Sequence, residues 1–416
     1  MAWEKVKLKE VTHTLKGYAF KSKFYVDDGV PVVRASDFTS DSISEDNLVY
    51  YPHKAIDSYS KYILHCDDVL VQTVGSWDFN PDSVVGKVVR VPRELDEALL
   101  NQNIVKLISD DLQMLDNKFL YYRLKCSDFA KHNIGNAVGA ANQASITLKT
   151  IGEFTFYLPD IKVQRKIADI LSAYDEFIEN NRRQVRLLEE AAQRLYKEWF
   201  VKFHFPGWEE TKMVDGLPVG WKKQPFKNLV HVIRGRSYSS EELDDNKGSY
   251  LINLKNIQPY GGYKFGEEKL YTGAYSQEQC VKGGDIVMSV TDMTAERRLI
   301  GHVARIPHLS KTAVISMDLI KLLPQGRIDP NYFYAMLRYS NKGVEFGQYA
   351  TGANVLHLKP DNIGLIDLVI PTDDLQIQFG KLVQVIFEKI ELIYSQIQLL
   401  QEARDRLLPR LMREGS

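Results

Sequence analysis

The sequence predicts an α+β protein in which two pseudo-repeated globular α/β domains are joined by two long helices that form an antiparallel coiled coil. Three observations predict this fold class. An apolar helical pattern runs over residues 164–200, the same pattern returns near the C-terminus, and paired strand-like blocks precede each pattern. A tandem duplication of one globular segment and one long helix explains all three.

The first long helix is predicted over residues 164–200. Its apolar residues recur at alternating steps of four and three, interrupted only by Asn181, as in a helix that packs along another helix. The seam consists of Ile167, Leu171, Tyr174, Ile178, Asn181, Val185, Leu188, Ala192, Leu195 and Trp199. A polar seam residue fixes the register of the pair at some loss of stability, so Asn181→Ile is predicted not to lower the melting temperature.

The second long helix is predicted because the same seam returns after a shift of 212 residues. It consists of Phe379, Val383, Ile386, Ile390, Ile393, Ile397, Leu400, Arg404, Leu407 and Leu411. Arg404 is its charged member, and we expect its side chain to reach water at the end of the seam. Each helix of about 37 to 40 residues would be about 55–60 Å long.

The globular segments repeat in the same order. Trp3 and the pair Lys16-Gly17 return as Trp221 and Arg234-Gly235. Further matched blocks pair residues 31–38 with 250–257, 68–71 with 285–288, 86–92 with 301–307, and 103–107 with 318–322. These blocks are short and rich in β-branched residues, so they predict strands. Residues 117–125 and 331–338 predict short helices capped by Asp116 and Asp329.

The repeat divides the chain into four segments. Residues 1–158 form the first globular domain and residues 159–205 the first long helix. Residues 206–370 form the second globular domain and residues 371–416 the second long helix. Pro206, Gly207 and Pro218 break any helix between the two copies.

The composition is that of an ordinary globular protein. The 416 residues carry a net charge of −1, so any contact with DNA must come from local patches of charge. The three cysteines are scattered, without the spacing of metal ligands or of a disulfide framework. No apolar run is long enough to span a membrane, and a cytoplasmic location is expected.

The sequence contains no familiar catalytic motif. It has no glycine-rich phosphate loop, no dinucleotide-binding fingerprint and no histidine pair suited to zinc. Asp82, Asp116 and Lys118 faintly match a nuclease pattern, but helix capping by Asp116 explains that aspartate better because Asp329 repeats it. We therefore predict no catalytic residue and no metal ligand.

At this point the chain resembles the specificity subunits of type I restriction-modification systems over essentially its whole length. The resemblance rests on Leu-Pro-Val-Gly-Trp at 217–221, on Gln164 and Gln376 at the start of each long helix, and on Trp-Phe-Val-Lys-Phe at 199–203. Leu-Leu-Glu-Glu at 187–190 also returns as Leu-Leu-Gln-Glu at 399–402. No single motif is diagnostic, but their doubled order is specific.

The resemblance implies a subunit that does no chemistry itself. Its globular domains would be target recognition domains, each binding one half of a split double-stranded DNA sequence. Two methyltransferase subunits using S-adenosylmethionine, and restriction subunits using ATP and magnesium, would be its partners. The alternatives are a coiled-coil protein-interaction scaffold without DNA specificity and a stand-alone nuclease with an unfamiliar site.

Reading of bases requires polar side chains on loops that enter a groove. The candidates in the first domain are Lys16, Arg34, Ser36, Gln72, Ser76, Trp77, Asn142, Gln143 and Lys149. Those in the second are Arg234, Arg236, Asn253, Lys255, Asn256, Thr291, Arg297, Arg298, Asn354 and Lys359.

Some of these candidates carry a more specific expectation. Lys16, Arg234 and Arg236 flank a glycine and are expected to hold phosphates. Arg297 and Arg298 are the strongest individual candidates, because their basic loop shows no obvious internal partner. Trp77 either stacks on a base or packs in the core.

Overall fold

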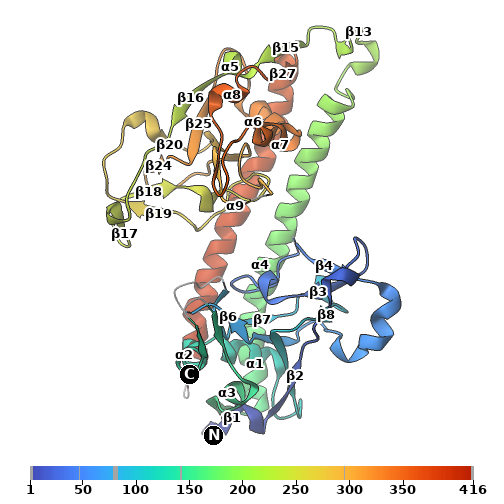
Figure 1. The fold of residues 1–416 in the computed structure, drawn as a ribbon, viewed down its shortest axis with the longest axis vertical. Coiled ribbons are helices and arrows are strands. Elements are labelled where there is room, and N and C mark those ends of the chain that lie inside the picture. Colours follow the sequence, from blue (N-terminus) through green and yellow to red (C-terminus); the bar gives the residue numbers. More distant parts are fainter. Residues whose placement is uncertain (1–2, 46, 78–82, 141–142, 295, 414–416) are drawn as a thin grey trace. The chain divides into compact units, whose positions relative to one another are not determined.

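The computed structural model describes residues 3–45, 47–77, 83–140, 143–294 and 296–413. These residues form two compact units (Figure 1). Unit 1 comprises Met1–Phe177 and Leu400–Ser416, and unit 2 comprises Ile178–Leu399. Each unit contains one globular head, head 1 (residues 3–158) or head 2 (residues 222–370), and parts of both long helices.

The two long helices lie where the sequence predicts them. Helix α4 spans Ile161–Tyr196 (36 residues) and continues as a π-helical turn over Lys197–Val201, and helix α9 spans Asp373–Leu411 (39 residues). The sequence predicts each long helix as a separate segment of the chain. In the structure, each compact unit instead contains part of α4 and part of α9. Contacts within each unit therefore include helix–helix contacts.

Unit 1 contains the first copy of the repeated fold. Its central sheet has the strand order β2-β9-β5-β7, and a second sheet, β4-β3-β8, pairs β3 and β8 in parallel. Its strands are β1 (Glu4–Lys7), β2 (Thr12–Lys16), β3 (Val30–Val33), β4 (Val49–Tyr51), β5 (Val69–Gln72), β6 (Val74–Gly75), β7 (Val88–Arg90), β8 (Leu99–Leu100), β9 (Ile104–Ser109), β10 (Val138–Ala140), β11 (Gln143–Ser145) and β12 (Thr155–Leu158). Its short helices are α1 (Asn117–Leu124), α2 (Ser127–Gly135) and α3 (Leu148–Gly152).

Unit 2 repeats this topology. Its central sheet is β16-β25-β21-β23, and its second sheet, β17-β19-β18-β24-β20, pairs β18 and β24 in parallel. Its strands are β13 (Met213–Val214), β14 (Leu217–Pro218), β15 (Lys222–Pro225), β16 (Val230–Arg234), β17 (Leu243–Asp244), β18 (Ser249–Ile252), β19 (Lys269–Tyr271), β20 (Cys280–Val281), β21 (Ile286–Ser289), β22 (Thr291–Asp292), β23 (Val303–Arg305), β24 (Ala313–Ile315), β25 (Leu319–Pro324), β26 (Leu356–His357) and β27 (Asp367–Ile370). Its short helices are α5 (Phe226–Leu229), α6 (Pro330–Tyr339), α7 (Lys342–Gln348) and α8 (Pro360–Ile363).

Several small features are repeated exactly where the sequence blocks match. In both sheets a lysine forms an ion pair with an aspartate, Lys106 with Asp68 at 2.5 Å and Lys321 with Asp285 at 2.8 Å. The predicted helix caps are confirmed: the Asp116 carboxylate accepts from the Phe119 amide and the Asp329 carboxylate from the Tyr332 amide. The heads are thus two versions of one fold.

The repeated glycine after the first sheet strand has a steric cause. A Cβ atom on Gly17 would overlap the carbonyl oxygen of Asn101, and one on Gly235 would overlap that of Ser316. The chain crosses the neighbouring segment closely at both places, which only glycine permits. This packing requirement explains the repeat of Gly17 and Gly235 without reference to a ligand.

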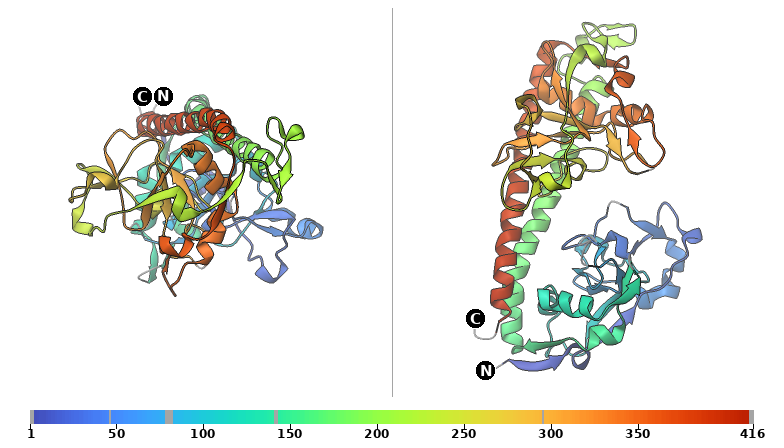
Figure 2. Two further views of the ribbon diagram at one scale, coloured as in Figure 1. Left: turned by 90° about the horizontal axis from the view of Figure 1, so that it is seen from above. Right: turned by 60° about the vertical axis from the view of Figure 1, so that its left-hand side comes forward.

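The long helices pack antiparallel within each unit (Figures 1 and 2). In unit 1 the start of α4, with Ile167 and Leu171, shares a core with Leu407 and Leu411 near the end of α9. In unit 2 the end of α4 contacts the start of α9, and the Phe200 and Phe379 rings lie 4.8 Å apart. Each head therefore rests on two helices that come from different halves of the sequence.

The segment between α4 and head 2 packs through its aromatic residues. Phe205 and Trp221 are buried in the core of unit 2, with ring centroids 5.5 Å apart. Trp208 is the exception, since it is 44% exposed. Most aromatic residues of the junction thus stabilise the fold.

Candidate nucleic-acid interface and helix-pairing surfaces

Equivalent loops in the two heads carry several candidate residues. In unit 1 the hairpin β10-β11 pairs with β6, and in unit 2 β26 pairs with β22. The positions correspond, because the Ile146 amide donates to the Thr73 carbonyl and the Leu358 amide donates to the Val290 carbonyl, each at 2.9 Å.

Exposed polar candidates lie in these hairpins. Gln143 begins β11 and is exposed, and Asn354 is exposed in the turn that precedes β26. Asn142 lies outside the described residues. The sequence therefore identified the same loop in both heads as a candidate DNA contact.

Other candidates are buried and serve the fold. Gln72, Ser76, Asn253, Asn256 and Thr291 are each less than 9% exposed. The Gln72 amide donates to the Val74 and Ser83 carbonyls, and the Asn256 side chain accepts from the Asn253 amide. These side chains shape the loops, so any contact with DNA from these segments comes from their neighbours.

Two further candidates have internal partners. Trp77 packs against the main core of unit 1, and its indole N–H donates to the Ala140 carbonyl at 3.0 Å. Arg34 forms an ion pair with Asp37 at 2.8 Å and donates to the Asn47 carbonyl. Trp77 is therefore half-buried against the core, and Arg34 holds its own turn together.

The expectation that Arg297 and Arg298 lack internal partners is wrong. The Arg297 guanidinium donates to the Gly347 carbonyl at 3.1 Å, and Arg298 lies 4.0 Å from the Glu296 carboxylate. Arg297 also adopts a positive φ of 55°, which is uncommon for a residue with a side chain. Both side chains remain half-buried and help to fix the loop.

This loop is organised by Asp292, which the sequence did not single out. Its fully buried carboxylate accepts hydrogen bonds from the Leu299 and Ile300 amides and from Thr294. Burial alone would raise the pKa of Asp292, but these hydrogen bonds outweigh burial and hold the pKa below its ordinary value. The loop that carries both arginines is thus built around one anion.

The remaining candidates are exposed. They are Lys16, Ser36, Lys149, Arg234, Arg236, Lys255 and Lys359. Lys16 and Arg234 end the equivalent strands β2 and β16, so the fold places one cation at the same position in each head. Lys149 and Lys359 are not equivalent, because Lys359 precedes α8 where Thr147 precedes α3.

The predicted helix seam is largely the buried face of the two helices. Ile167, Leu171, Ile178, Val383, Ile390 and Ile397 are buried, and Asn181, Leu188, Leu195 and Leu407 are half-buried. One prediction was wrong: the Arg404 side chain does not reach water but is only 10% exposed. It binds Asp175 at 2.6 Å and lies 3.5 Å from Asp41.

The charged cluster around Arg404 was not visible in the sequence. Asp175 is on α4, Arg404 is on α9 and Asp41 is in head 1, so residues far apart in sequence meet in unit 1. Burial raises the pKa of Tyr122, and so does Asp175, which accepts from its hydroxyl at 2.5 Å. The one available signal was a lone arginine in an apolar seam.

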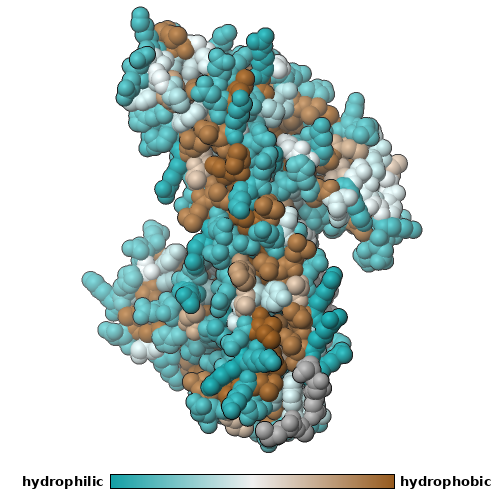
Figure 3. All heavy atoms as spheres, turned by 180° about the vertical axis from the view of Figure 1, so that it is seen from behind, coloured by the Kyte–Doolittle hydropathy of each residue, from teal (hydrophilic) through white to brown (hydrophobic). Residues whose placement is uncertain are grey.

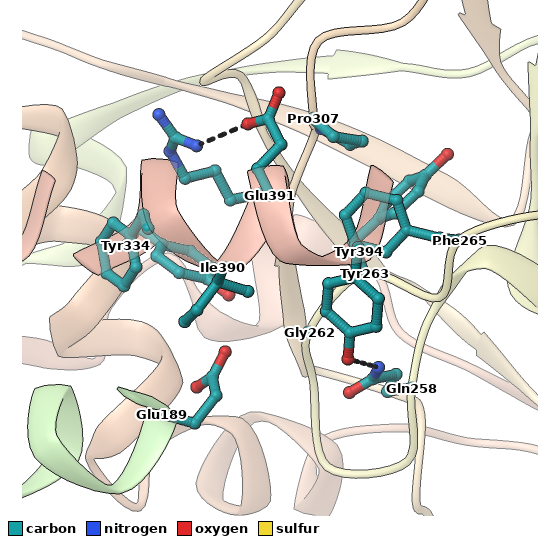
Figure 4. A pocket seen from close by; sticks show the side chains of 12 residues that line it. Glu189, Gln258, Gly262, Tyr263, Phe265, Pro307, Tyr334, Ile390, Glu391 and Tyr394 are labelled. Atoms are coloured by element: carbon teal, nitrogen blue, oxygen red, sulfur yellow. Dashed lines mark hydrogen bonds and ion pairs between the residues drawn. The ribbon is translucent and has the colours of Figure 1, made fainter. Parts of the chain in front are cut away.

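Head 2 is held on α9 by a different polar contact, shown in Figure 4. Glu391 on α9 accepts from the His308 amide and lies 3.6 Å from Arg305. Tyr394, one turn further on, stacks on Phe265 with ring centroids 4.2 Å apart. These side chains line a pocket of about 70 Å³, too small for more than a few water molecules.

The described residues contain neither a metal-ligand cluster nor a membrane-spanning helix. No group of three or more histidine, cysteine, aspartate or glutamate residues there could hold a metal ion. Among the same residues, no helix is long and apolar enough to span a membrane.

Comparison with known proteins shows which proteins the chain is similar to. Residues 2–190 match the family model described as "Type I restriction modification DNA specificity domain". The type I restriction enzyme MjaIX specificity subunit of Methanocaldococcus jannaschii is 25% identical over 304 residues, which cover 71% of this chain and 68% of the relative. The type I restriction enzyme HindI specificity subunit of Haemophilus influenzae is 22% identical over 396 residues, covering 79% of this chain and 83% of the relative.

A solved structure shares the fold. The crystal structure of the type I restriction-modification system S subunit from M. genitalium superposes with a TM-score of 0.56 at 16% identity, covering 100% of this chain and 97% of that chain. In the family model that matches residues 2–190, in its relatives and in its fold, the chain is similar to type I restriction-modification specificity subunits.

Proposed function

We propose that this chain recognises a bipartite DNA target, with one half of the sequence bound by each head. The observation that carries the proposal is the duplicated topology: both heads have the same strand order in the central sheet and an exposed loop at the corresponding position, but different side chains. Two similar domains with different reading residues suit two different half-sites. The long helices would set the spacing between these half-sites.

The chain has no catalytic role of its own. Specificity subunits select DNA, while methylation and cleavage are carried out by other subunits of the type I complex. S-adenosylmethionine, ATP and magnesium are therefore cofactors of those subunits and not of this chain. A complex that acts on the cell's DNA would work in the cytoplasm.

We further propose that the outer faces of the long helices bind two methyltransferase subunits, which in turn hold the restriction subunits. Large apolar side chains remain exposed there in both units, and Figure 3 shows hydrophobic side chains reaching one face of each unit. They are Val163, Ile170 and Phe177 in unit 1, and Leu187, Leu382, Val385, Leu392 and Leu399 in unit 2. Val163, Ile170 and Phe177 recur every seven residues, the spacing of a face that packs on a further helix.

Exchange of one head tests the bipartite model. Residues 1–158 are replaced by the first head of another family member, and the methylated sequence is mapped in cells that supply the methyltransferase. We expect one half of the methylated sequence to change and the other half to stay. A change in both halves, or in neither, would contradict the assignment of one half-site to each head.

Binding measurements separate this proposal from the scaffold alternative. A DNA-recognition subunit should bind its mapped sequence more tightly than a shuffled one, with methyltransferase present, and the affinity should fall steeply with salt. A scaffold without DNA specificity would show no preference between the two sequences.

A further inference from the structure

Unit 1 contains a buried ionic cluster at the crossing of the two long helices. The Arg404 guanidinium binds the Asp175 carboxylate at 2.6 Å, the Asp405 carboxylate at 2.9 Å and the Asp41 carboxylate at 3.5 Å. The side chains of Arg404, Asp175 and Asp41 are 10%, 9% and 6% exposed. Such a cluster holds together only while every charge keeps its partner.

The equivalent crossing in unit 2 has no charged residue at either of the two corresponding helix positions. A shift of 212 residues places Phe387 of α9 where Asp175 lies in α4, and Ala192 of α4 where Arg404 lies in α9. Phe387 and Ala192 are buried in one apolar core, and the Phe387 ring lies 5.2 Å from the Tyr334 ring. Two copies of one fold thus use opposite chemistry at the same crossing.

This difference distinguishes the native helix pair from the two pairs that a duplicated sequence also permits. If α4 packed against a second α4, Asp175 would face Ala192 and lose the Arg404 guanidinium. If α9 packed against a second α9, the Arg404 guanidinium would face the Phe387 ring, and the Arg305 guanidinium already lies 5.7 Å from the centroid of that ring. Either arrangement separates the buried Asp175–Arg404 ion pair, which is strongly destabilising.

We propose that the Arg404–Asp175–Asp41 cluster selects the partner of each long helix, so that α4 pairs with α9 and neither helix pairs with a second copy of itself. The apolar seam alone cannot make this choice, because the two seams are built from similar residues at the same spacing. A buried polar group that specifies helix partners has the same physical basis in coiled coils. The cluster thereby prevents each half of the chain from pairing with the same half of another molecule.

The first test lets the halves choose partners. A protease site is inserted between Val214 and Asp215, in a hairpin where Val214 is 54% exposed, and the folded full-length protein is cleaved. Cleaved wild type and a cleaved charge-reversed variant, D175R/R404D, carry different mass tags. They are mixed in mild denaturant, returned to buffer and counted by native mass spectrometry.

We expect wild-type first halves to recover wild-type second halves, and charge-reversed first halves to recover charge-reversed second halves. Pairs of two identical halves should stay at background. A statistical mixture of hybrids, or pairs of identical halves, would overturn the proposal. The matched control reverses Glu402 and Arg406, an exposed ion pair within α9, and should give the statistical mixture.

The second test needs no cleavage and applies even if the charge-reversed variant fails to fold. In the full-length chain, R404A and D175F should each lower the Tm, because each leaves buried charges unpaired. The double variant D175F/R404A copies the two apolar helix positions of unit 2 and, with D41N removing the remaining buried carboxylate of the cluster, should recover most of the lost Tm. A combined variant that is as unstable as the sum of the single changes would overturn the proposal.

Discussion

His302 is a titratable side chain that the fold of head 2 buries without a partner for its Nε2 atom. Burial lowers its pKa from the ordinary value of 6.5 to about 4, and the nearby Arg338 guanidinium adds to this effect. Between pH 4 and pH 6.5, His302 is therefore mostly protonated in the unfolded chain and mostly neutral in the folded protein.

The stability of the folded protein falls as the pH falls, because protonation of His302 favours the unfolded state. Above pH 6.5 the imidazole is neutral in both states and does not affect stability, and as the pH falls toward 4 the unfolded state gains a proton first. We expect the free energy of unfolding to fall by about 2 kcal/mol between pH 7 and pH 5 through this group. Urea denaturation at both pH values measures this change.

The matching variant removes the titrating group. His302→Gln should lose this part of the pH dependence, while His231→Gln, a change at an exposed histidine of the same head, should retain it. The carboxylates that titrate in both variants cancel in the comparison. Equal slopes in the two variants would show that His302 does not titrate as its burial implies.

Single residues also show what sequence reasoning can and cannot reach. The capping roles of Asp116 and Asp329 depend on amides two or three residues away, so the local sequence predicts them. Arg297 instead finds its acceptor on Gly347, fifty residues away, and Arg404 finds Asp41 across nearly the whole chain. Partners at such separations depend on tertiary packing, which one sequence does not reveal.

At the scale of elements, each long helix is tied to its head by a buried glutamine. The Gln164 side chain accepts from the Asp116 amide at 3.0 Å and donates to the Met114 and Pro159 carbonyls. Gln376 repeats this arrangement with the Asp329 amide at 3.3 Å and the Pro371 carbonyl. The two glutamines that marked the helix starts in the sequence thus join the helix to the loop before α1 or α6.

These contacts give a graded prediction. Gln164→Ala removes three hydrogen bonds to backbone groups, one of them buried, and should lower the free energy of unfolding by about 1–3 kcal/mol. Gln376→Ala removes two weaker bonds and should cost less. Thermal or urea denaturation measures both, and alanine at the exposed neighbours Arg165 and Gln378 should leave stability within about 0.5 kcal/mol. A larger effect from the neighbours would contradict the proposed tie.

The sequence predicts the helices and strands with long regular patterns better than the very short ones. The long helices repeat their pattern over many turns, so their existence and approximate length could be read from the sequence. Matched blocks located β5, β9 and their counterparts because those strands are buried and β-branched. The two-residue strands β6 and β22 were missed, since so short a segment pairs only because its neighbours hold it in place.

At the scale of the whole molecule, the duplication was predicted but the division of the helices was not. The sequence places each long helix after its own head, whereas each compact unit combines one head with parts of both helices. Helix pairing between the two halves of the chain is a tertiary contact between distant segments. A heptad pattern indicates that a helix packs against another helix, but it does not show which helix that is.

The proposed role of the helices as a spacer can be tested by lengthening both at the level where they face each other. Seven residues are inserted after Asn180 in α4 and seven after Leu399 in α9, which keeps both seams in register and turns the helices by only about 20°. The added length is about 10.5 Å, close to three base pairs at 3.4 Å each. We expect the spacer between the methylated half-sites to lengthen by about three base pairs while both half-sites stay the same.

Affinity should fall as well, because three base pairs turn the DNA further than the insertion turns the helices. Insertion into α4 alone shifts one seam against the other and should abolish recognition, and an unchanged spacer in the doubly lengthened protein would show that the helices do not set the distance.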